Sequence, residues 1–310
     1  MTNPKADRVR DVAKLAQRAA RVRRGLFLAE GPQAVREALR LDARRAEDRS
    51  EEGADDGASR LVVEVYASAE CLARYSELDV LARASGTLRL ASDEVLAAMA
   101  DTVNPQGIVA VCRQLDVPLT EVLLRRPRLV AVLCRVQDPG NAGTILRAAD
   151  AAGADAVVLT EGSVDLYNPK AVRSTAGSLF HVPVVVAAPV DELIAQLRDA
   201  GIGVLAADGY GPVDLDALQD SSAARRLSAG ERSGEESSSY ALEAPTAWLF
   251  GNEAQGLSDE ELALADARVA VPVYGEAESL NVGTAATVCL YASARAQRRS
   301  PVDQPGSGVR

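Results

Sequence analysis

The stretch DPGNAGTILRAADAAGA, residues 138–154, joins a glycine-bearing loop to an apolar helix that carries a single arginine, Arg147. Loops of this kind often hold phosphate, so a nucleotide site is the first hypothesis. A P-loop needs a lysine directly after its last glycine, and none is present here. A dinucleotide fingerprint needs G-x-G-x-x-G, which this glycine spacing does not fit. The residues instead predict a helix that is capped by Asn141, starts at about Ala142 and ends at Gly153.

Two further loops with polar side chains follow apolar segments. LFGNEAQGL, residues 249–257, carries Glu253 beside a Gly-Asn pair, and ESLNV, residues 278–282, carries Asn281 before the last expected helix. Taken singly, these are explained as a tight turn and a helix cap, and Arg147 as a surface arginine. All three loops lie at the carboxyl ends of expected strands, where ligands bind in open parallel sheets. We therefore expect them to converge on one pocket.

The elements that must position these loops follow an alternating pattern. Apolar strands separated by helices predict an α/β fold with a parallel sheet covered on both faces. Its expected domain spans residues 128–300, with a tail at 301–310 that we expect to be disordered. Residues 1–113 predict a smaller α/β domain, and 114–127 a linker.

Two segments differ from this background in composition. Residues 43–58 hold six acidic and three basic residues, and residues 219–243 hold five acidic residues, three basic residues and seven serines. Acidic or serine-rich segments with little apolar content cannot bury enough surface to fold alone. Both segments are predicted to be disordered surface insertions.

Composition limits the chemistry that is available. The only histidine, His181, precedes an apolar strand, where a structural role is expected, so a Ser-His-Asp triad or Cys-His pair is disfavoured. The four cysteines are widely spaced, which predicts buried, reduced thiols rather than disulfides or a metal site. No apolar run reaches 18 residues and the N-terminus is charged, so we expect a cytoplasmic protein with no membrane span. The cysteine spacing and the single histidine also predict that no metal is bound. The four cysteines are Cys71, Cys112, Cys134 and Cys289.

The three loops together resemble a known set of motifs. N-x-G-x-x-x-R, ending at Arg147, is followed by G-N-E-x-x-G at 251–256 and S-L-N-V at 279–282. In order and separation they are similar to the motifs of the SpoU family of RNA 2'-O-ribose methyltransferases. The likeness covers about residues 128–299. RRGLFLAEGPQAVREAL, residues 23–39, resembles the small substrate-binding domain of many members, which is related to ribosomal-protein folds.

The resemblance implies features that hydrophobic periodicity does not show. It implies a C-terminal trefoil knot whose loops bind S-adenosylmethionine, largely through backbone groups. It also implies a homodimer that shares its active site across the two subunits. Carried over to this chain, the expected cofactor contacts are Leu249, Gly251, Val271, Ser279 and Leu280.

The same resemblance implies a catalytic role for Arg147 as the base that takes the ribose hydroxyl proton. A guanidinium with a pKa above about 12 does this poorly. Arg147 is therefore expected to bind the 2'-oxygen or an adjacent phosphate and to stabilise negative charge as it develops. Glu253 would orient Arg147 or accept the proton. Asn141 and Asn281 would hold the loops or the ribose.

RNA is the expected partner although the formal net charge is −10. The first 24 residues hold eight Lys or Arg and two Asp, so Arg23 and Arg24 are candidate backbone contacts, as is Arg173. Ribosomal RNA is favoured over transfer RNA because of the N-terminal domain. A non-catalytic RNA-binding or ribosome-assembly factor and a Rossmann-type nucleotide enzyme are the alternatives. Either a housekeeping or an antibiotic-resistance role would fit these motifs.

Overall fold

The computed structural model describes residues 1–51, 60–227 and 240–298. The chain forms two compact units. The first unit contains Met1–Asp116, Ala142–Arg147 and Val164–His181, and the second contains Val117–Asn141, Ala148–Ser163 and the chain from Val182 onward.

The first unit is built on a four-stranded sheet in the order β1-β4-β2-β3. The β1–β4 and β4–β2 pairs are antiparallel, and β2–β3 is parallel. Its strands are β1 Leu26–Glu30, β2 Val62–Ala67, β3 Leu88–Leu90 and β4 Ile108–Arg113. Its helices are α1 Asp7–Ala13, η1 Lys14–Ala16, α2 Arg18–Arg24, α3 Pro32–Glu51, α4 Ala69–Arg74, α5 Ser76–Ala84, α6 Asp93–Met99, α9 Pro169–Ser174 and η3 Ser178–Phe180.

The start of the first acidic segment is helical, which corrects its prediction as a disordered loop. Helix α3 continues to Glu51, and the rest of the segment lies outside the described residues. Its Ala, Arg and Glu residues favour helix, which outweighs the segment's charge. Just before it, buried Asp42 accepts the backbone N–H groups of Leu61 at 2.7 Å and Val62 at 3.3 Å, which ties the helix to the sheet.

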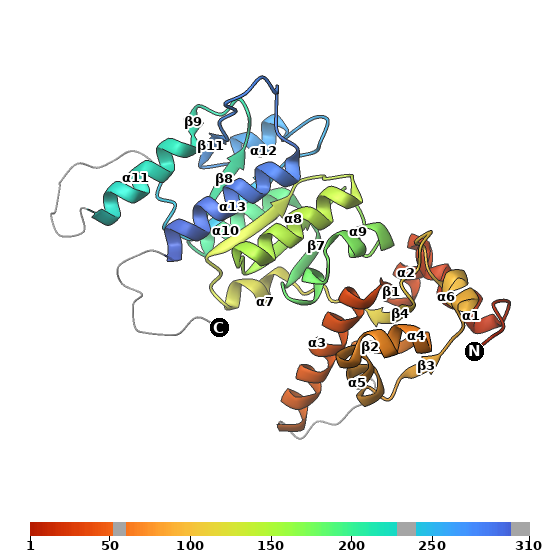
Figure 1. Cartoon of the computed structure of the whole chain (residues 1–310). Coiled ribbons are helices and arrows are strands. Elements are labelled where there is room, and N and C mark those ends of the chain that lie inside the picture. The colour runs from red at the N-terminus through yellow and green to blue at the C-terminus, as the bar shows by residue number, and fades with distance from the viewer. Residues whose placement is uncertain (52–59, 228–239, 299–310) are drawn as a thin grey trace. The chain divides into compact units, whose positions relative to one another are not determined.

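The second unit contains a seven-stranded, wholly parallel sheet in the order β7-β6-β5-β10-β8-β11-β9, which confirms the predicted fold class (Figure 1). Its strands are β5 Leu129–Leu133, β6 Ala156–Thr160, β7 Val184–Ala188, β8 Gly203–Ala207, β9 Val213–Asp214, β10 Thr246–Phe250 and β11 Ala267–Ala270. Its helices are α7 Leu119–Leu124, α8 Pro139–Ala152, α10 Val190–Asp199, α11 Leu215–Leu227, α12 Asp259–Ala263 and α13 Val282–Arg298. The middle of α8 clusters with the first unit.

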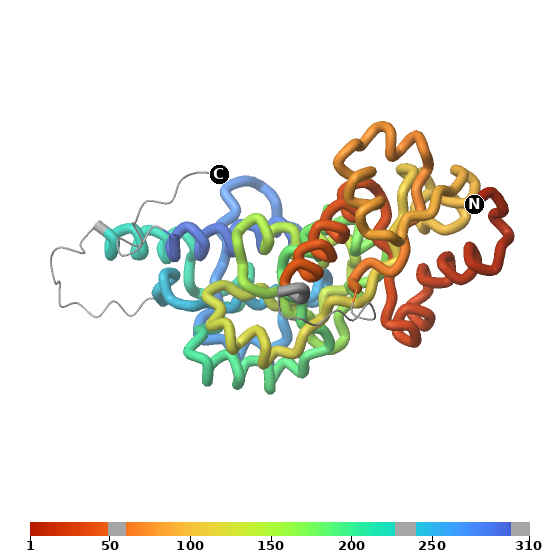
Figure 2. Tube along the Cα trace, turned by 90° about the horizontal axis from the view of Figure 1, so that it is seen from below, coloured from red at the N-terminus to blue at the C-terminus, as the bar shows by residue number. Residues whose placement is uncertain are grey.

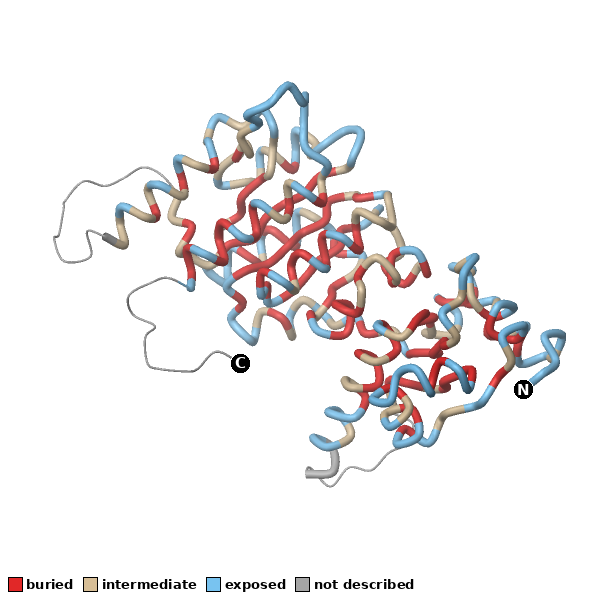
Figure 3. The backbone as a smooth tube through the Cα atoms, viewed as in Figure 1, coloured by how far each residue is buried: buried red, intermediate tan, exposed pale blue. Residues whose placement is uncertain are grey.

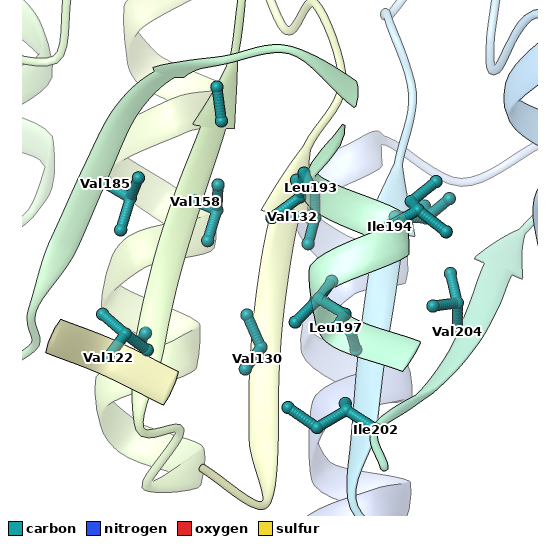
Figure 4. Packing of buried hydrophobic residues seen from close by; sticks show 14 of the residues in the cluster. Val122, Val130, Val132, Val158, Val185, Leu193, Ile194, Leu197, Ile202 and Val204 are labelled. Atoms are coloured by element: carbon teal, nitrogen blue, oxygen red, sulfur yellow. The ribbon is translucent and has the colours of Figure 1, made fainter. Parts of the chain in front are cut away.

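Strand β10 is buried along its whole length, and Figure 3 shows the central strands of this sheet as buried. Because side chains alternate along a strand, both faces of the sheet must be covered. On one face, Leu249 joins a core cluster with Leu193 and Leu197 of α10 and with valines of the neighbouring strands (Figure 4). On the other face, the Trp248 indole N–H donates to Ser293 Oγ of α13 at 2.9 Å. Helices therefore cover both faces, and the loops at the strand ends are left to form a site.

The segment 114–127, predicted as a linker, contains α7. Val122 of this helix is 3% exposed and lies in the core cluster of the parallel sheet. The backbone N–H of Val117 donates to the carbonyl of Val184 at 2.9 Å. This segment is therefore packed along part of its length.

The second acidic segment also begins in a helix, which again corrects the prediction of a disordered loop. Residues 219–227 belong to α11, which lies beside α13 (Figure 2). Ser222 is 1% exposed, and Arg225 pairs with Glu243 at 3.0 Å beyond the gap. The segment between them lies outside the described residues, as does the predicted tail at 301–310.

All four cysteines are free and buried, as predicted. His181 contacts Glu37 through Nε2 at 3.3 Å, a contact within the first unit. No described helix is both long and apolar enough to cross a membrane.

Candidate active site

The turn that joins β5 to α8 orients the first motif. Asp138 caps the helix, with Oδ1 accepting the Asn141 N–H at 2.9 Å, and Pro139 occupies the first turn. The predicted cap at Asn141 is therefore wrong. Proline suits the first helical position because its φ is fixed and no N–H is needed there, so the helix starts three residues early. Asn141 lies inside the first turn, and its side chain is available for other contacts. The predicted end at Gly153, with φ +69°, is confirmed.

The second motif is a tight turn held by its own asparagine. Asn252 Oδ1 accepts the backbone N–H groups of Ala254 and Gln255 at 2.9 and 3.2 Å, and its Nδ2 donates to the Arg135 carbonyl at 3.0 Å. A Cβ on Gly251 would lie 2.6 Å from the Gly256 carbonyl oxygen, so only glycine fits this close approach. This turn fixes the position of Glu253.

Glu253 binds the start of α8 with both carboxylate oxygens. Oε1 accepts from the Asp138 N–H at 3.0 Å and from Asn141 Nδ2 at 3.1 Å, while Oε2 accepts from the Gln137 N–H at 3.1 Å. Partial burial raises the pKa of the Glu253 carboxyl. These hydrogen bonds outweigh that effect, so the pKa lies below its usual value. A carboxylate held in this way is a weak proton acceptor and a firm anchor for the turn.

Asn281 connects the third motif to the first. Its Nδ2 donates to Asn141 Oδ1 at 3.0 Å, and its Oδ1 accepts the Gly283 N–H at 2.9 Å, which confirms the predicted cap of the last helix. One hydrogen-bonded chain, Glu253–Asn141–Asn281, therefore joins all three motif loops.

The loop between β11 and α13 offers many exposed backbone groups. Residues 273–280 are exposed and, within the part of the chain that the structure describes, have no backbone hydrogen bond. Leu280 is 37% exposed and Val273 is 39% exposed. Of the other expected cofactor residues, Leu249 is fully buried at the end of β10 and Val271 directly follows β11. This loop can bind a ligand through its backbone without first breaking internal bonds.

Arg147 lies in the third turn of α8. Its side chain is exposed, and it has no hydrogen-bond or ion-pair partner among the described residues. Glu253 binds the first turn of the same helix and makes no direct contact with Arg147. No contact therefore supports the expected role of Glu253 in orienting Arg147. Gly143, one turn before Arg147, packs closely on α9, because a Cβ there would lie 2.7 Å from the Ala171 carbonyl oxygen and would also meet Ser174 Oγ.

The candidate RNA-contacting arginines differ in availability. Arg23 is exposed and has no hydrogen-bond or ion-pair partner among the described residues, whereas Arg24 donates to the Asp11 carbonyl at 2.9 Å. Arg173 forms ion pairs with Glu30 at 3.0 Å and Asp101 at 3.1 Å. An RNA phosphate at Arg173 would have to compete with two carboxylates.

Two further residues, which were not predicted from the sequence, hold this region. Asp138 was detectable, because an Asp-Pro pair after a strand is a helix-start signal. The second is Arg135, with φ +54°, whose guanidinium binds the buried carboxylate of Glu261 at 2.6 and 3.1 Å. The two residues are 126 positions apart, so no local pattern reveals the pair.

The comparison with known families agrees with this geometry. Residues 128–291 match the SpoU rRNA Methylase family, and residues 6–110 match the MRM3-like substrate binding domain. The chain belongs to the SpoU rRNA methylase family. Together, the two matched ranges contain the whole parallel sheet and nearly all of the four-stranded sheet.

Relatives in the SpoU family match nearly the whole chain. The 23S rRNA (guanosine(2553)-2'-O)-methyltransferase RlmP of Bacillus subtilis is 33% identical over 290 residues, covering 93% of this chain and 96% of RlmP. The AdoMet-bound rRNA methyltransferase from Sinorhizobium meliloti has a TM-score of 0.72 at 27% identity, covering 95% of this chain and 97% of that one. AviRb from Streptomyces viridochromogenes, in complex with AdoMet, has a TM-score of 0.71 at 27% identity. That match covers 96% of this chain and 100% of AviRb.

Proposed function

We propose that this protein is an S-adenosylmethionine-dependent 2'-O-methyltransferase that modifies ribosomal RNA. The observation that carries the proposal is the chain Glu253–Asn141–Asn281, which holds the three family motif loops together. Similar proteins are named as 23S rRNA 2'-O-methyltransferases, which favours ribosomal RNA over transfer RNA. Intact motifs and an available Arg147 favour an enzyme over a non-catalytic RNA-binding factor.

The described residues fit S-adenosylmethionine. The exposed backbone of residues 273–280 has free donors and acceptors, and apolar side chains flank it. When bound, S-adenosylmethionine supplies an electrophilic methyl group on a sulfonium. Solved relatives were obtained with AdoMet. The residues we propose to hold it are Leu249, Gly251, Val271, Ser279 and Leu280.

The protein's own residues position the ribose rather than activate it strongly. We assign Arg147 to bind the 2'-oxygen, or the phosphate beside it, because its guanidinium is exposed and has no partner among the described residues. The positive charge would stabilise the oxygen as its proton leaves. Glu253 holds the first turn of α8 in position and does not take the proton, since its lowered pKa makes it a weak base. Asn141 and Asn281 hold the first and third motif loops together through the hydrogen bond between their side chains.

Further features complete this proposal. The family resemblance implies a trefoil knot in the parallel-sheet domain and a homodimer. The charged N-terminus favours a cytoplasmic location, and the basic N-terminal segment favours RNA backbone contacts at Arg23 and Arg24. Arg173 is left out of these contacts because its guanidinium already binds Glu30 and Asp101. Arg23 is the stronger of the two contacts because it is exposed and has no partner among the described residues. The exposed face of α13, which carries Val288 and Tyr291, supports the homodimer.

Methyl transfer to an unmodified 23S rRNA transcript tests the proposal. We expect incorporation at a ribose 2'-oxygen, and Arg147→Ala should lower kcat by about 100-fold or more, the effect typical of losing one charge-stabilising donor. Arg147→Lys should recover part of the rate, and S-adenosylmethionine affinity by calorimetry should stay unchanged. Arg125→Ala, at another exposed arginine, is the control. Methylation of a base, or full activity in Arg147→Ala, would contradict the mechanism. RNA binding without methyl transfer would favour the non-catalytic alternative.

A further inference from the structure

A pocket of about 280 Å³ opens in the first unit, and its lining contains no residue of the motif loops. It lies where β1 ends and α3 begins, and the loop from Ala100 to Gln106 closes one side. Buried Ala34, Ile108 and Val109 contribute apolar lining. This volume is close to the lower limit for small-molecule sites, which have an apolar lining with a few polar groups.

Three amide side chains surround this apolar lining. Gln33, Asn104 and Gln106 are exposed, and none of their side chains has a hydrogen-bond partner in residues 1–51, 60–227 or 240–298. A carboxamide offers both donors and an acceptor in one plane. Amide side chains are the groups that pair with the edges of nucleobases, adenine above all.

The charges at the pocket argue against a phosphate. Arg173 is the only cation in the lining, and its guanidinium already binds Glu30 and Asp101. One positive charge beside two negative charges leaves no net attraction for an anion. The uncharged amides and the apolar lining suit a neutral planar group instead.

The pocket walls are held in place before any ligand arrives. Buried Glu30 accepts the backbone N–H groups of Asp101 at 2.9 Å and Thr102 at 3.2 Å, which fixes the loop. Gly31, with φ +87°, leaves room for Gln106, because a Cβ there would lie 2.6 Å from Gln106 Oε1. Ala176 in the lining adopts φ +50°, a strained conformation that is common at functional sites.

We propose that this pocket binds one unpaired nucleobase of the RNA substrate, using the amides of Asn104 and Gln106 to read its edge. The inference rests on the proposed function, because it takes RNA as the substrate. Proteins read RNA sequence mainly at bases that are splayed out of loops and bulges. The pocket would therefore add selectivity for the RNA site through one unpaired base.

Methyl-transfer kinetics on a 23S rRNA fragment give the first test. Gln106→Ala and Asn104→Ala should each raise the KM for RNA by about 10-fold, with kcat and S-adenosylmethionine affinity unchanged. Gln17→Ala, an exposed amide of the same unit outside the pocket, should leave KM unchanged. The salt dependence of binding should stay the same, since a lost phosphate contact would reduce its slope. An unchanged KM, a reduced slope, or an equal effect in Gln17→Ala would overturn the proposal.

Abasic substitutions in the RNA give the decisive test. Unpaired nucleotides of the fragment are made abasic one at a time, and the base of the methylated nucleotide is kept. One position should weaken binding by about 10-fold for the unmodified enzyme and have no further effect on Gln106→Ala, as a double-mutant cycle requires for interacting partners. If each abasic substitution weakens binding equally in the unmodified enzyme and in Gln106→Ala, the pocket does not bind a base. If the unmodified enzyme transfers no methyl group to any RNA, the proposed function itself fails.

Discussion

Glu253 shows how the contacts of a residue decide its role. Its position in a Gly-Asn-Glu motif suggested a proton acceptor. Its three hydrogen bonds to Gln137, Asp138 and Asn141 instead stabilise the first turn of α8. The sequence could identify the residue but not its partners, because those lie more than 110 positions away.

Replacing Glu253 with glutamine should destabilise the protein in a pH-dependent way. The pKa of the native carboxyl lies below the ordinary value of 4.5, so the native state binds its proton less readily than the unfolded chain. The stabilisation is therefore complete above pH 4.5 and is lost as the pH falls through the lower native pKa. We expect Glu253→Gln to cost about 1 kcal/mol at pH 7, a modest value because the group is partly exposed.

Denaturant unfolding of the two proteins between pH 3 and pH 7 measures this difference. The gap in unfolding free energy should be constant above about pH 5 and should narrow below pH 4.5. Glu276→Gln, at an exposed position of the third loop, should have the same unfolding free energy as the unmodified protein at each pH. A gap that stays constant down to pH 3 would mean that the charge of Glu253 is not what stabilises the turn.

Helix α8 shows what a glycine contributes at the scale of an element. Gly143 lies in the middle of the helix, where alanine would normally stabilise by up to about 1 kcal/mol. Here the added Cβ would meet Ser174 Oγ and the Ala171 carbonyl of α9. We expect Gly143→Ala to destabilise by about 1–3 kcal/mol, as overpacking does, so the sign of the effect is reversed.

Thermal unfolding of Gly143→Ala checks this expectation. The variant Gly143→Ala/Ser174→Ala should recover part of the loss, but not all of it, because the Ala171 carbonyl stays in place. Gly209→Ala, a glycine with open space around it, is the control and should change stability little. An increase in stability for Gly143→Ala would show that α8 and α9 do not pack this closely.

The elements that the sequence predicted best are those with strong periodicity. The alternation of apolar strands and helices predicted the parallel sheet, although β9, with only Val213 and Asp214, is too short to leave a pattern. The errors occurred where composition and local structure disagree. Residues 219–227 look disordered by serine and charge content, but Leu218 and Ser222 are buried and hold α11 in place. Tertiary packing decided these cases, and it is not visible in the residue types alone.

At the scale of the whole molecule, sequence order is a poor guide to which unit a segment joins. Residues 164–181 follow β6 and lie within the predicted domain at 128–300, while their contacts cluster with those of the first compact unit. The ring of Tyr167 lies 4.9 Å from that of Phe27, and buried Arg21 binds Asp165 at 2.6 Å. Contacts across some 140 residues, made by residues of ordinary type, leave no signal in one sequence.

The proposed homodimer leads to a test on α13. One face of this helix is buried, while the opposite face exposes Thr284, Val288 and Tyr291 at helical spacing. Val288 is 38% exposed and Tyr291 is 49% exposed, which is unfavourable for a helix face that meets only water. A second copy of the chain packed on this stripe would bury both side chains.

Val288→Glu should convert such a dimer to a monomer, because the buried carboxylate would lack a partner in the interface. Light scattering should give twice the chain mass of 32.5 kDa for the unmodified protein and the single-chain mass for the variant. Val80→Glu, at a valine that is 66% exposed in the first unit, should remain dimeric. If the active site is shared between subunits, Val288→Glu should also lose methyl transfer while its thermal unfolding stays cooperative. A dimer that persists in Val288→Glu would place the interface elsewhere, and a monomeric unmodified protein would remove the dimer from the mechanism.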